Sequence, residues 1–325
     1  MRNLNSPSIR KPARIVAVLT TIGGCCCLAP LAYVLRGCMI EHSRHENGDF
    51  TFDISPDGRT LVLAGVGEGG RDLYLFDLIT RKVTPLTSSG SYDICPTFSP
   101  DGKRVAFTRG VPGVRADQLC VIDLATREVV QLTDSDENVS SPSFLPDGKS
   151  ILCTVETQYR WGGLSSSWFE GGRLREIHIE SKRQTLLKAP TFPVFGPRVS
   201  RDGKWMVWYG DGASIASSNH PEKARVIADQ GSFPATNADG NRLAISIGNY
   251  APDHQIFVTN RSGGARRPMS NSKGSFFSVF SPDGRDLYFL NECGEQGLKM
   301  ADVATGKSVS VASMQLFESP RTFRE

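Results

Sequence analysis

Short apolar runs recur along most of the chain, and a polar turn interrupts each set after its first run. In the first set, apolar and polar positions alternate over residues 50–54, and the apolar runs 61–64, 73–78 and 83–87 follow. Alternation predicts a half-buried strand, and near-continuous apolar runs predict strands that are covered on both faces. Each set therefore predicts four strands, and the second set, over residues 94–133, repeats the order closely.

The interrupting turns share one design built on an Asp-Gly pair. Proline at the second position presets φ, a leading Ser or Asn hydrogen-bonds its own backbone, and glycine accepts a left-handed conformation. Between two apolar runs, such a turn predicts a β-hairpin, so we assign these Asp and Gly residues to structure and not to catalysis. The six turns are Ser55-Pro56-Asp57-Gly58, Ser99-Pro100-Asp101-Gly102, Leu145-Pro146-Asp147-Gly148, Ser200-Arg201-Asp202-Gly203, Asn237-Ala238-Asp239-Gly240 and Ser281-Pro282-Asp283-Gly284.

The spacing of the turns predicts the architecture. Successive aspartates at 57, 101, 147, 202, 239 and 283 are 44, 46, 55, 37 and 44 residues apart. A period of roughly 40–50 residues built on strands is typical of a propeller blade. We therefore predict an all-β fold, a six-bladed β-propeller of four-stranded antiparallel blades over residues 49–312, followed by a C-terminal tail over 313–325. The first repeat begins with its innermost strand and the last ends with its outermost, so the ends exchange no strand unless residues 314–317 or 39–40 contribute.

The N-terminal region has a different pattern. Residues 1–14 are polar and basic, and the 21 residues from 15 to 35 carry no charge. As a helix they would measure roughly 31 Å, enough to cross a bilayer core of about 30 Å. We predict a transmembrane signal-anchor helix, with residues 1–14 in the cytoplasm and residues 36–48 as a tether to a propeller on the periplasmic or extracellular side. A cleaved signal peptide and a lipoprotein signal at Ile22-Gly23-Gly24-Cys25 are the alternatives.

The composition of the chain limits the classes of ligand and partner that we expect it to bind. The net charge of the 325 residues is +3, and four basic residues lie within the first 14 positions, so the rest is near neutral. No basic field favours nucleic acid. The eight cysteines show no zinc-type spacing and fit buried or lipid-facing thiols. We predict no metal and no cofactor.

One repeat carries a family resemblance. Pro96-Thr97-Phe98-Ser99-Pro100-Asp101-Gly102-Lys103-Arg104-Val105-Ala106-Phe107, with Gln131-Leu132-Thr133 at its end, resembles the WD40-like, PD40-type repeats of TolB-like propellers. The resemblance covers about residues 49–312 and implies the propeller fold. It implies no single function, because such repeats occur both in binding proteins and beside enzyme domains. TolB itself also has an N-terminal α/β domain, for which the tether leaves no room.

The candidate binding site lies on the more varied loops. In a four-stranded meander, the Asp-Gly turns share one end with the third-to-fourth-strand turns, and the longer, varied loops share the other end, where binding residues usually lie. The loop over residues 157–173 is the most distinctive. We predict a binding surface formed by Tyr159, Arg160, Trp161, Trp168 and Phe169, with Arg109 and Arg115 of the preceding repeat on the same rim. The structural alternatives are aromatic side chains that cap their own blade and arginines that are simply solvated.

These features predict a non-enzymatic, membrane-anchored, extracytoplasmic binding or scaffold protein that recognises a protein or cell-envelope component. The alternative is an enzyme, a hydrolase or lyase with its site at the mouth of the central tunnel. No nucleophile elbow stands on a strand-to-helix turn, so we name no catalytic residue. Asp134, Asp136 and Glu137 could form a Ca²⁺ loop, but no ligand register follows them and we expect a solvated acidic loop.

Overall fold

The computed structural model describes residues 50–67, 69–110, 116–134, 137–156, 159–162, 166–169, 172–189, 194–248, 253–270 and 273–323. The chain divides into two compact units, Met1–Glu46 and Asn47–Glu325, and all described residues belong to the second. The predicted anchor over residues 15–35 and the tether over 36–48 lie outside the described residues. Within the described part, no helix has the length and apolar character needed to cross a membrane.

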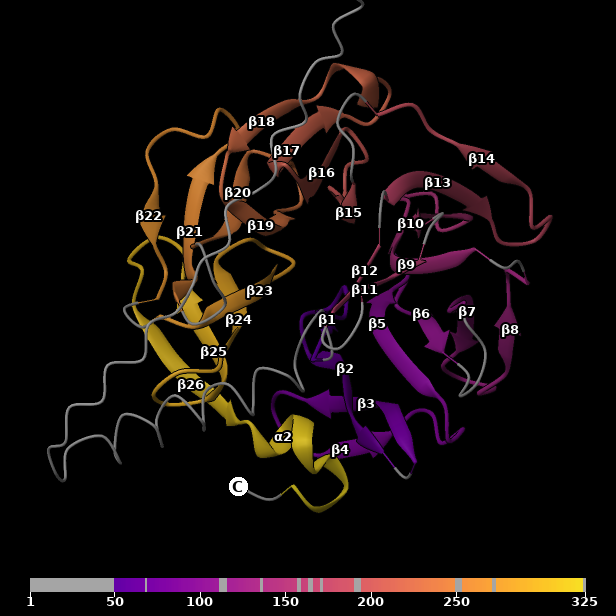
Figure 1. Cartoon of the computed structure of the whole chain (residues 1–325). Helices are drawn as coiled ribbons and strands as arrows, with labels where there is room; N and C mark the ends of the chain where they lie inside the picture. Colours follow the sequence, from indigo (N-terminus) through magenta and orange to yellow (C-terminus); the bar gives the residue numbers. More distant parts are fainter. Residues whose placement is uncertain are drawn as a thin grey trace, which may run out of the picture. The chain divides into compact units, whose positions relative to one another are not determined.

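The described part is almost entirely β-structure, as the sequence predicts (Figure 1). The first two repeats form an eight-stranded sheet of β1 (Phe52–Ile54), β2 (Thr60–Gly67), β3 (Gly70–Asp77), β4 (Val83–Pro85), β5 (Tyr92–Phe98), β6 (Arg104–Gly110), β7 (Gln118–Asp123) and β8 (Val129–Gln131). One parallel pair, Arg71 opposite Tyr92, joins β3 to β5. The sheet therefore consists of two antiparallel four-stranded groups.

Each later repeat forms its own antiparallel four-stranded sheet. These strands are β9 (Asn138–Phe144), β10 (Ser150–Glu156), β13 (Gly172–His178) and β14 (Gln184–Leu186); β15 (Phe195–Val199), β16 (Trp205–Gly210), β17 (Gly212–Ser217) and β18 (Arg225–Ala228); β19 (Gly231–Thr236), β20 (Arg242–Ile247), β21 (Gln255–Asn260) and β22 (Arg267–Pro268); β23 (Ser275–Phe280), β24 (Asp286–Asn291), β25 (Gly297–Asp302) and β26 (Ser308–Ser313). A separate two-stranded sheet pairs β11 (Tyr159–Gly162) with β12 (Ser166–Phe169), and the short helices are η1 (Pro221–Lys223), α2 (Gln315–Glu318) and η3 (Pro320–Thr322).

The inner strands are apolar throughout because each sheet packs between two neighbours. Successive side chains of a strand point to opposite faces. In β6, Val105 and Phe107 pack toward the first four-stranded group, whereas Ala106 packs toward the third. A buried hydrophobic cluster of this kind joins each consecutive pair of groups. The prediction of strands covered on both faces is confirmed.

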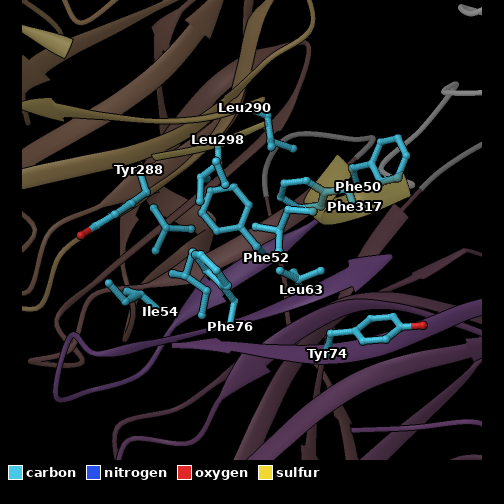
Figure 2. Packing of buried hydrophobic residues seen from close by; sticks show 14 of the residues in the cluster. Phe50, Phe52, Ile54, Leu63, Tyr74, Phe76, Tyr288, Leu290, Leu298 and Phe317 are labelled. Atoms are coloured by element: carbon cyan, nitrogen blue, oxygen red, sulfur yellow. The ribbon is translucent and has the colours of Figure 1, made fainter. Parts of the chain in front are cut away.

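A further cluster joins the last group to the first, and the C-terminal segment completes it. Figure 2 shows Phe317 of α2 beside Phe50 and Phe52, with ring centroids 5.7 and 6.5 Å apart. Leu290 and Leu298 of the last group lie in the same cluster. In Figure 1, α2 lies beside the indigo strands of the first group. Residues 314–317 thus join the two ends, but as a helical turn packed on the sheet and not as an exchanged strand.

Polar contacts reinforce this junction. The Arg81 guanidinium donates to the backbone carbonyl of Val311 in β26. Arg321 of η3 lies with Nη2 3.4 Å from Asp72 Oδ2 and Nε 3.4 Å from the Tyr74 hydroxyl. Phe323 packs on Phe76 with ring centroids 5.9 Å apart. The first group is therefore bound to the end of the chain by both apolar and charged contacts.

Candidate functional site

The four-stranded groups have two chemically different ends. We call the end with the Asp-Gly turns the turn end, and the opposite end the loop end. At the turn end, the N–H that opens the third-to-fourth-strand turn donates to a carbonyl beside the Asp-Gly turn, as Leu78 does to Arg59 and Leu124 to Lys103. The same bond recurs in the other groups, so both kinds of turn share one end, as predicted.

The Asp-Gly turns are closed by their own side chains. The Ser99 hydroxyl donates to Asp101 Oδ1 at 2.6 Å, and the same oxygen accepts the Lys103 N–H at 3.1 Å. The glycine of each turn has a φ near +70°, for example +70° at Gly102. These hydrogen bonds lower the pKa of Asp101, and the equivalent serine hydroxyls lower the pKa of Asp57 and Asp283. The turns thus use their Asp and Gly residues for local structure.

Neighbouring turns also pack on one another. A β-carbon at Gly102 would lie 3.3 Å from Pro56 Cδ, and one at Gly58 would lie 3.3 Å from Pro282 Cδ. In four of the six turns a proline of the neighbouring turn therefore covers the glycine, and the last turn contacts the first.

The innermost strands share a second irregularity, a bulge with one left-handed residue. The five residues are Cys95, Ser141, Gly196, Phe233 and Phe277, with φ of 53°, 51°, 56°, 45° and 45°. Four precede a proline, and each strand shifts its register against its neighbour near this point. Bulges re-aim side chains and are frequent beside functional sites. The sequence carries a signal for this bulge, because the proline recurs three positions before the first residue of the Asp-Gly turn.

A cavity of about 310 Å³ opens among the innermost strands at the turn end. Strands β1, β5, β9, β15, β19 and β23 each contribute to its lining, together with turn residues Pro56, Pro100, Pro146 and Arg201. Asp53, Thr97, Ser143 and Arg198 occupy the same position in four successive strands and are among its polar lining residues.

Beside this cavity an aromatic cluster gathers side chains from the later groups. The ring centroid of Tyr209 lies 5.8 Å from Phe195 and 5.0 Å from Phe233. Phe233 in turn lies 6.3 Å from Phe277, and the Arg198 guanidinium carbon lies 5.3 Å from the Phe277 ring centroid. Two of the left-handed bulge residues therefore place their rings in this cluster.

Buried charges are concentrated at the loop end. Asp93 in β5 is fully buried and accepts two hydrogen bonds from Arg109 in β6, at 2.7 and 2.8 Å. Asp72 is nearly as buried, and burial raises its pKa despite the neighbouring Arg321. The bidentate geometry satisfies the Asp93 carboxylate, which would otherwise be costly to bury.

Two further acids at the same end have raised pKa values. Burial raises the pKa of Asp117 and of Glu156, and the negative charge of Asp117 adds to the effect on Glu156. Glu156 accepts hydrogen bonds from Asn138 Nδ2 at 3.0 Å and Ser140 Oγ at 3.2 Å. Burial also raises the pKa of Tyr209 and raises that of the Cys95 thiol to about 11. The pattern of apolar runs does not predict that these buried titratable side chains come together, since they belong to separate repeats.

The predicted binding residues fall into three cases. The loop over 157–173 contains a β-hairpin, in which Tyr159 lies opposite Phe169, Arg160 opposite Trp168 and Trp161 opposite Ser167. Alternating aromatic residues favour strands, which explains why the segment is not an irregular loop. Arg109 is engaged by Asp93 in a buried ion pair and is not a free rim charge. Arg115 lies outside the described residues.

In the acidic loop, Glu137 pairs with an arginine side chain. Glu137 receives two hydrogen bonds from Arg175, at 2.6 and 3.1 Å, whereas Asp136 lies outside the described residues. In the part of the chain that the structure describes, no group of three or more His, Cys, Asp or Glu residues is placed to hold a metal ion.

Comparisons with known proteins identify the repeat. Residues 42–158 match the family described as the TolB beta propeller domain. A TolB homolog of Chlorobium chlorochromatii is 43% identical over 51 residues, which cover 16% of this chain and 12% of that protein. The Tol-Pal system protein TolB of Francisella tularensis subsp. mediasiatica is 38% identical over 52 residues, with the same coverage. The chain thus matches about an eighth of the length of these relatives.

Solved structures agree on the fold. TolB from Acinetobacter baumannii superposes with a TM-score of 0.60 at 16% identity, covering 86% of this chain and 68% of that one. An oligogalacturonate lyase in complex with manganese gives a TM-score of 0.57 at 17% identity, covering 83% and 78%. At these identities the likeness shows the fold alone. Together with the family match over residues 42–158, it confirms the resemblance seen in the Asp-Gly repeats: the repeats of this chain are similar to those of TolB-like β-propellers.

Proposed function

We propose that this chain is a six-bladed, membrane-anchored binding or scaffold propeller, which acts outside the cytoplasm and recognises a protein or cell-envelope component. The observation that carries the proposal is the β11–β12 hairpin at the loop end. Elsewhere the second and third strands are joined more briefly: in the fourth group only Asp211 separates β16 from β17. A single long, aromatic hairpin on a regular scaffold is the kind of feature that binds a partner.

Three contacts support the count of six blades and the closed ring. The turn-end cavity is lined by the innermost strand of every repeat. The last Asp-Gly turn packs on the first, and a hydrophobic cluster joins the last group to the first. A closed ring leaves no face of a four-stranded group exposed, and it hides the apolar faces that each repeat cannot bury alone.

The partner and the location rest on relatives and on the N-terminal sequence. The matched relatives are named as TolB proteins, some of the Tol-Pal system, which favours a partner in the cell envelope. The uncharged residues 15–35, preceded by basic residues, favour a retained anchor with the propeller on the far side of the membrane. After carbonate washing, the full chain should remain with the membrane fraction; its release would argue against the anchor.

The central experiment is quantitative crosslinking from native membranes with the full chain and a variant carrying Trp161→Ala and Trp168→Ala. We expect the variant to lose at least several-fold of the partners that wild type captures reproducibly. Ile79→Ala is the matched control, because Ile79 is 71% exposed and lies at the turn end. Equal recovery of the same partners by both hairpin and control variants would remove the hairpin from the binding surface.

An enzyme remains the second candidate because of one observation, the raised pKa values of Asp117 and Glu156 at the loop end. Carboxyl groups with raised pKa values are typical of general acids. A hydrolase or lyase at this mouth would lose turnover of its substrate in Glu156→Gln while retaining its fold. Partner capture that survives Glu156→Gln unchanged, with no turnover in either protein, favours the binding role.

A further inference from the structure

The turn-end cavity carries an excess of positive charge. Its charged lining residues are Asp53, Arg198 and Arg201, two cations and one anion. At about 310 Å³ it is at the lower limit of small-molecule sites, which span roughly 300–1,000 Å³. The cavity is therefore large enough for a small ligand and has a charge imbalance that an anion would correct.

Arg198 is the cation best placed to bind one. It projects from β15 into the lining, and its guanidinium stacks on the Phe277 ring at 5.3 Å. Among the described residues, neither a hydrogen bond nor an ion pair engages its side chain. Stacking fixes the plane of the guanidinium and leaves its edge free, which suits two parallel hydrogen bonds to a planar oxyanion.

The acid in the lining does not compete for this arginine. Asp53 Oδ2 accepts the Thr97 hydroxyl at 3.0 Å and the Phe98 N–H at 2.8 Å. Its other oxygen accepts the Ile54 N–H at 2.9 Å. The first two bonds tie the first inner strand to the second, and together the three satisfy the carboxylate within the protein.

Two buried hydroxyl groups each have a proton available for a hydrogen bond to a ligand. The Ser278 Oγ is buried, and no hydrogen-bond partner reaches it among the described residues. Ser143 is 6% exposed, and its Oγ accepts the Val199 N–H at 3.4 Å, which leaves its own proton available. A buried hydroxyl without a partner is costly, so a ligand oxygen at this position would be stabilising.

Apolar side chains line the cavity beside its polar residues, which also include Ser99, Ser200 and Thr236, and they define the body of the ligand. Ile54, Phe98, Phe144, Val279 and Phe280 surround the polar groups, with the turn prolines at the opening. We propose that this cavity binds a small organic carboxylate with an apolar body, held by Arg198 and by the hydroxyls of Ser143 and Ser278. This site is at the opposite end from the hairpin and does not depend on the function proposed above.

Isothermal titration of the full chain in neutral detergent, with benzoate as the probe, tests the proposal. Benzamide has the same shape without the charge, and inorganic phosphate has charge without an apolar body. We expect saturable benzoate binding, at least tenfold weaker binding of both other probes, and a dissociation constant for benzoate at least tenfold higher in Arg198→Gln. Ser278→Ala should give a smaller loss, of about twofold to tenfold.

Matched variants separate the site from general effects of charge and folding. Arg285→Gln removes one positive charge at the same end, where Arg285 is 84% exposed, and should change benzoate binding less than twofold. Arg198→Lys keeps the charge but loses the paired donors, so it serves if Arg198→Gln misfolds, and it should bind several-fold less tightly than wild type. The Trp161→Ala and Trp168→Ala variant should bind benzoate as wild type does. Absence of binding to wild type, equal binding of benzamide or phosphate, or unchanged affinity in folded Arg198 variants would overturn the proposal.

Discussion

The Asp-Gly turns at one end of the repeats and the buried acids at the other end treat their carboxyl groups in opposite ways. At the turn end, serine hydroxyls and backbone N–H groups hold the pKa values of Asp57, Asp101 and Asp283 below the ordinary value. At the loop end, burial raises the pKa values of Asp117 and Glu156. The same residue types are thus stabilised as anions in these turns and penalised as anions at these buried positions.

This difference separates structure from candidate function. The turns lie at the surface and recur in every repeat, and their polar groups are satisfied by hydrogen bonds within the turn. Each turn therefore contributes a small and local stabilisation. The loop end gathers buried charges, the closing C-terminal segment and the aromatic hairpin, each of which occurs once. Binding or catalysis would explain features that destabilise the folded state and do not recur in every repeat.

Removing the aromatic anchor of the closing segment should have the largest effect. Phe317 is fully buried at the loop end of the first group and packs on Phe50 and Phe52. We expect Phe317→Ala to lower the free energy of unfolding by about 3–5 kcal/mol, measured by urea denaturation.

The control for this variant is Ile79→Ala at the turn end, which should change stability by less than about 0.5 kcal/mol because Ile79 is exposed. A loss below about 1 kcal/mol in Phe317→Ala would show that the C-terminal turn packs on the first group without stabilising its junction with the last group.

Breaking the buried ion pair should come next. Arg109→Ala leaves the fully buried Asp93 carboxylate without its partner, and we expect a loss of about 3 kcal/mol in the same urea measurement. Adding Asp93→Asn to this variant should recover part of the loss, because the uncompensated charge is then gone.

The exposed pair Arg285–Asp283 at the turn end, with atoms 3.6 Å apart, gives the comparison. Arg285→Ala should cost less than about 0.5 kcal/mol. Similar losses in the two arginine variants would contradict the contrast between the ends.

Most of the scaffold could be predicted from the sequence because its determinants are local. An Asp-Gly turn fixes its own hairpin, and an apolar run of the right length forms the strand beside it, so the four strands of each repeat follow from neighbouring residues. The odd third repeat was also visible, since Trp161 and Trp168 stand in a segment that no other repeat has.

The charged and closing contacts could not be predicted in this way, because they join residues that the fold brings together from afar. The Arg321–Asp72 contact spans 249 positions. Arg109 reads as a solvated or binding charge until the β5–β6 register places it opposite Asp93. Arg198 occupies the position of Thr97 and Ser143, and only the packing of inner strands from different repeats turns these positions into one cavity.

The smallest predicted effect concerns how the free energy of unfolding depends on pH, which should have opposite signs for Glu156 and Asp101. An acid with a raised pKa in the folded state stabilises the protein less as pH rises above its ordinary value, because the unfolded chain releases the proton more readily. Glu156→Gln should therefore be no less stable than wild type at pH 7, with its advantage fading as pH falls toward the ordinary glutamate value of 4.5. Asp101 acts in reverse: its lowered pKa gives stability above 3.8 that is lost as pH falls further.

Urea denaturation between pH 3 and 8 measures both slopes. Asp101→Asn should cost a few tenths to about 1 kcal/mol at pH 7, since the turn is exposed, and its deficit should shrink below pH 4. Glu180→Gln, on the surface of the same repeat as Glu156, should change stability by less than about 0.5 kcal/mol at pH 7. If Glu156→Gln and Asp101→Asn change with pH in the same direction, the carboxyl groups at the two ends do not differ in the way that their surroundings imply, and burial at the loop end is offset by the hydrogen bonds from Asn138 and Ser140.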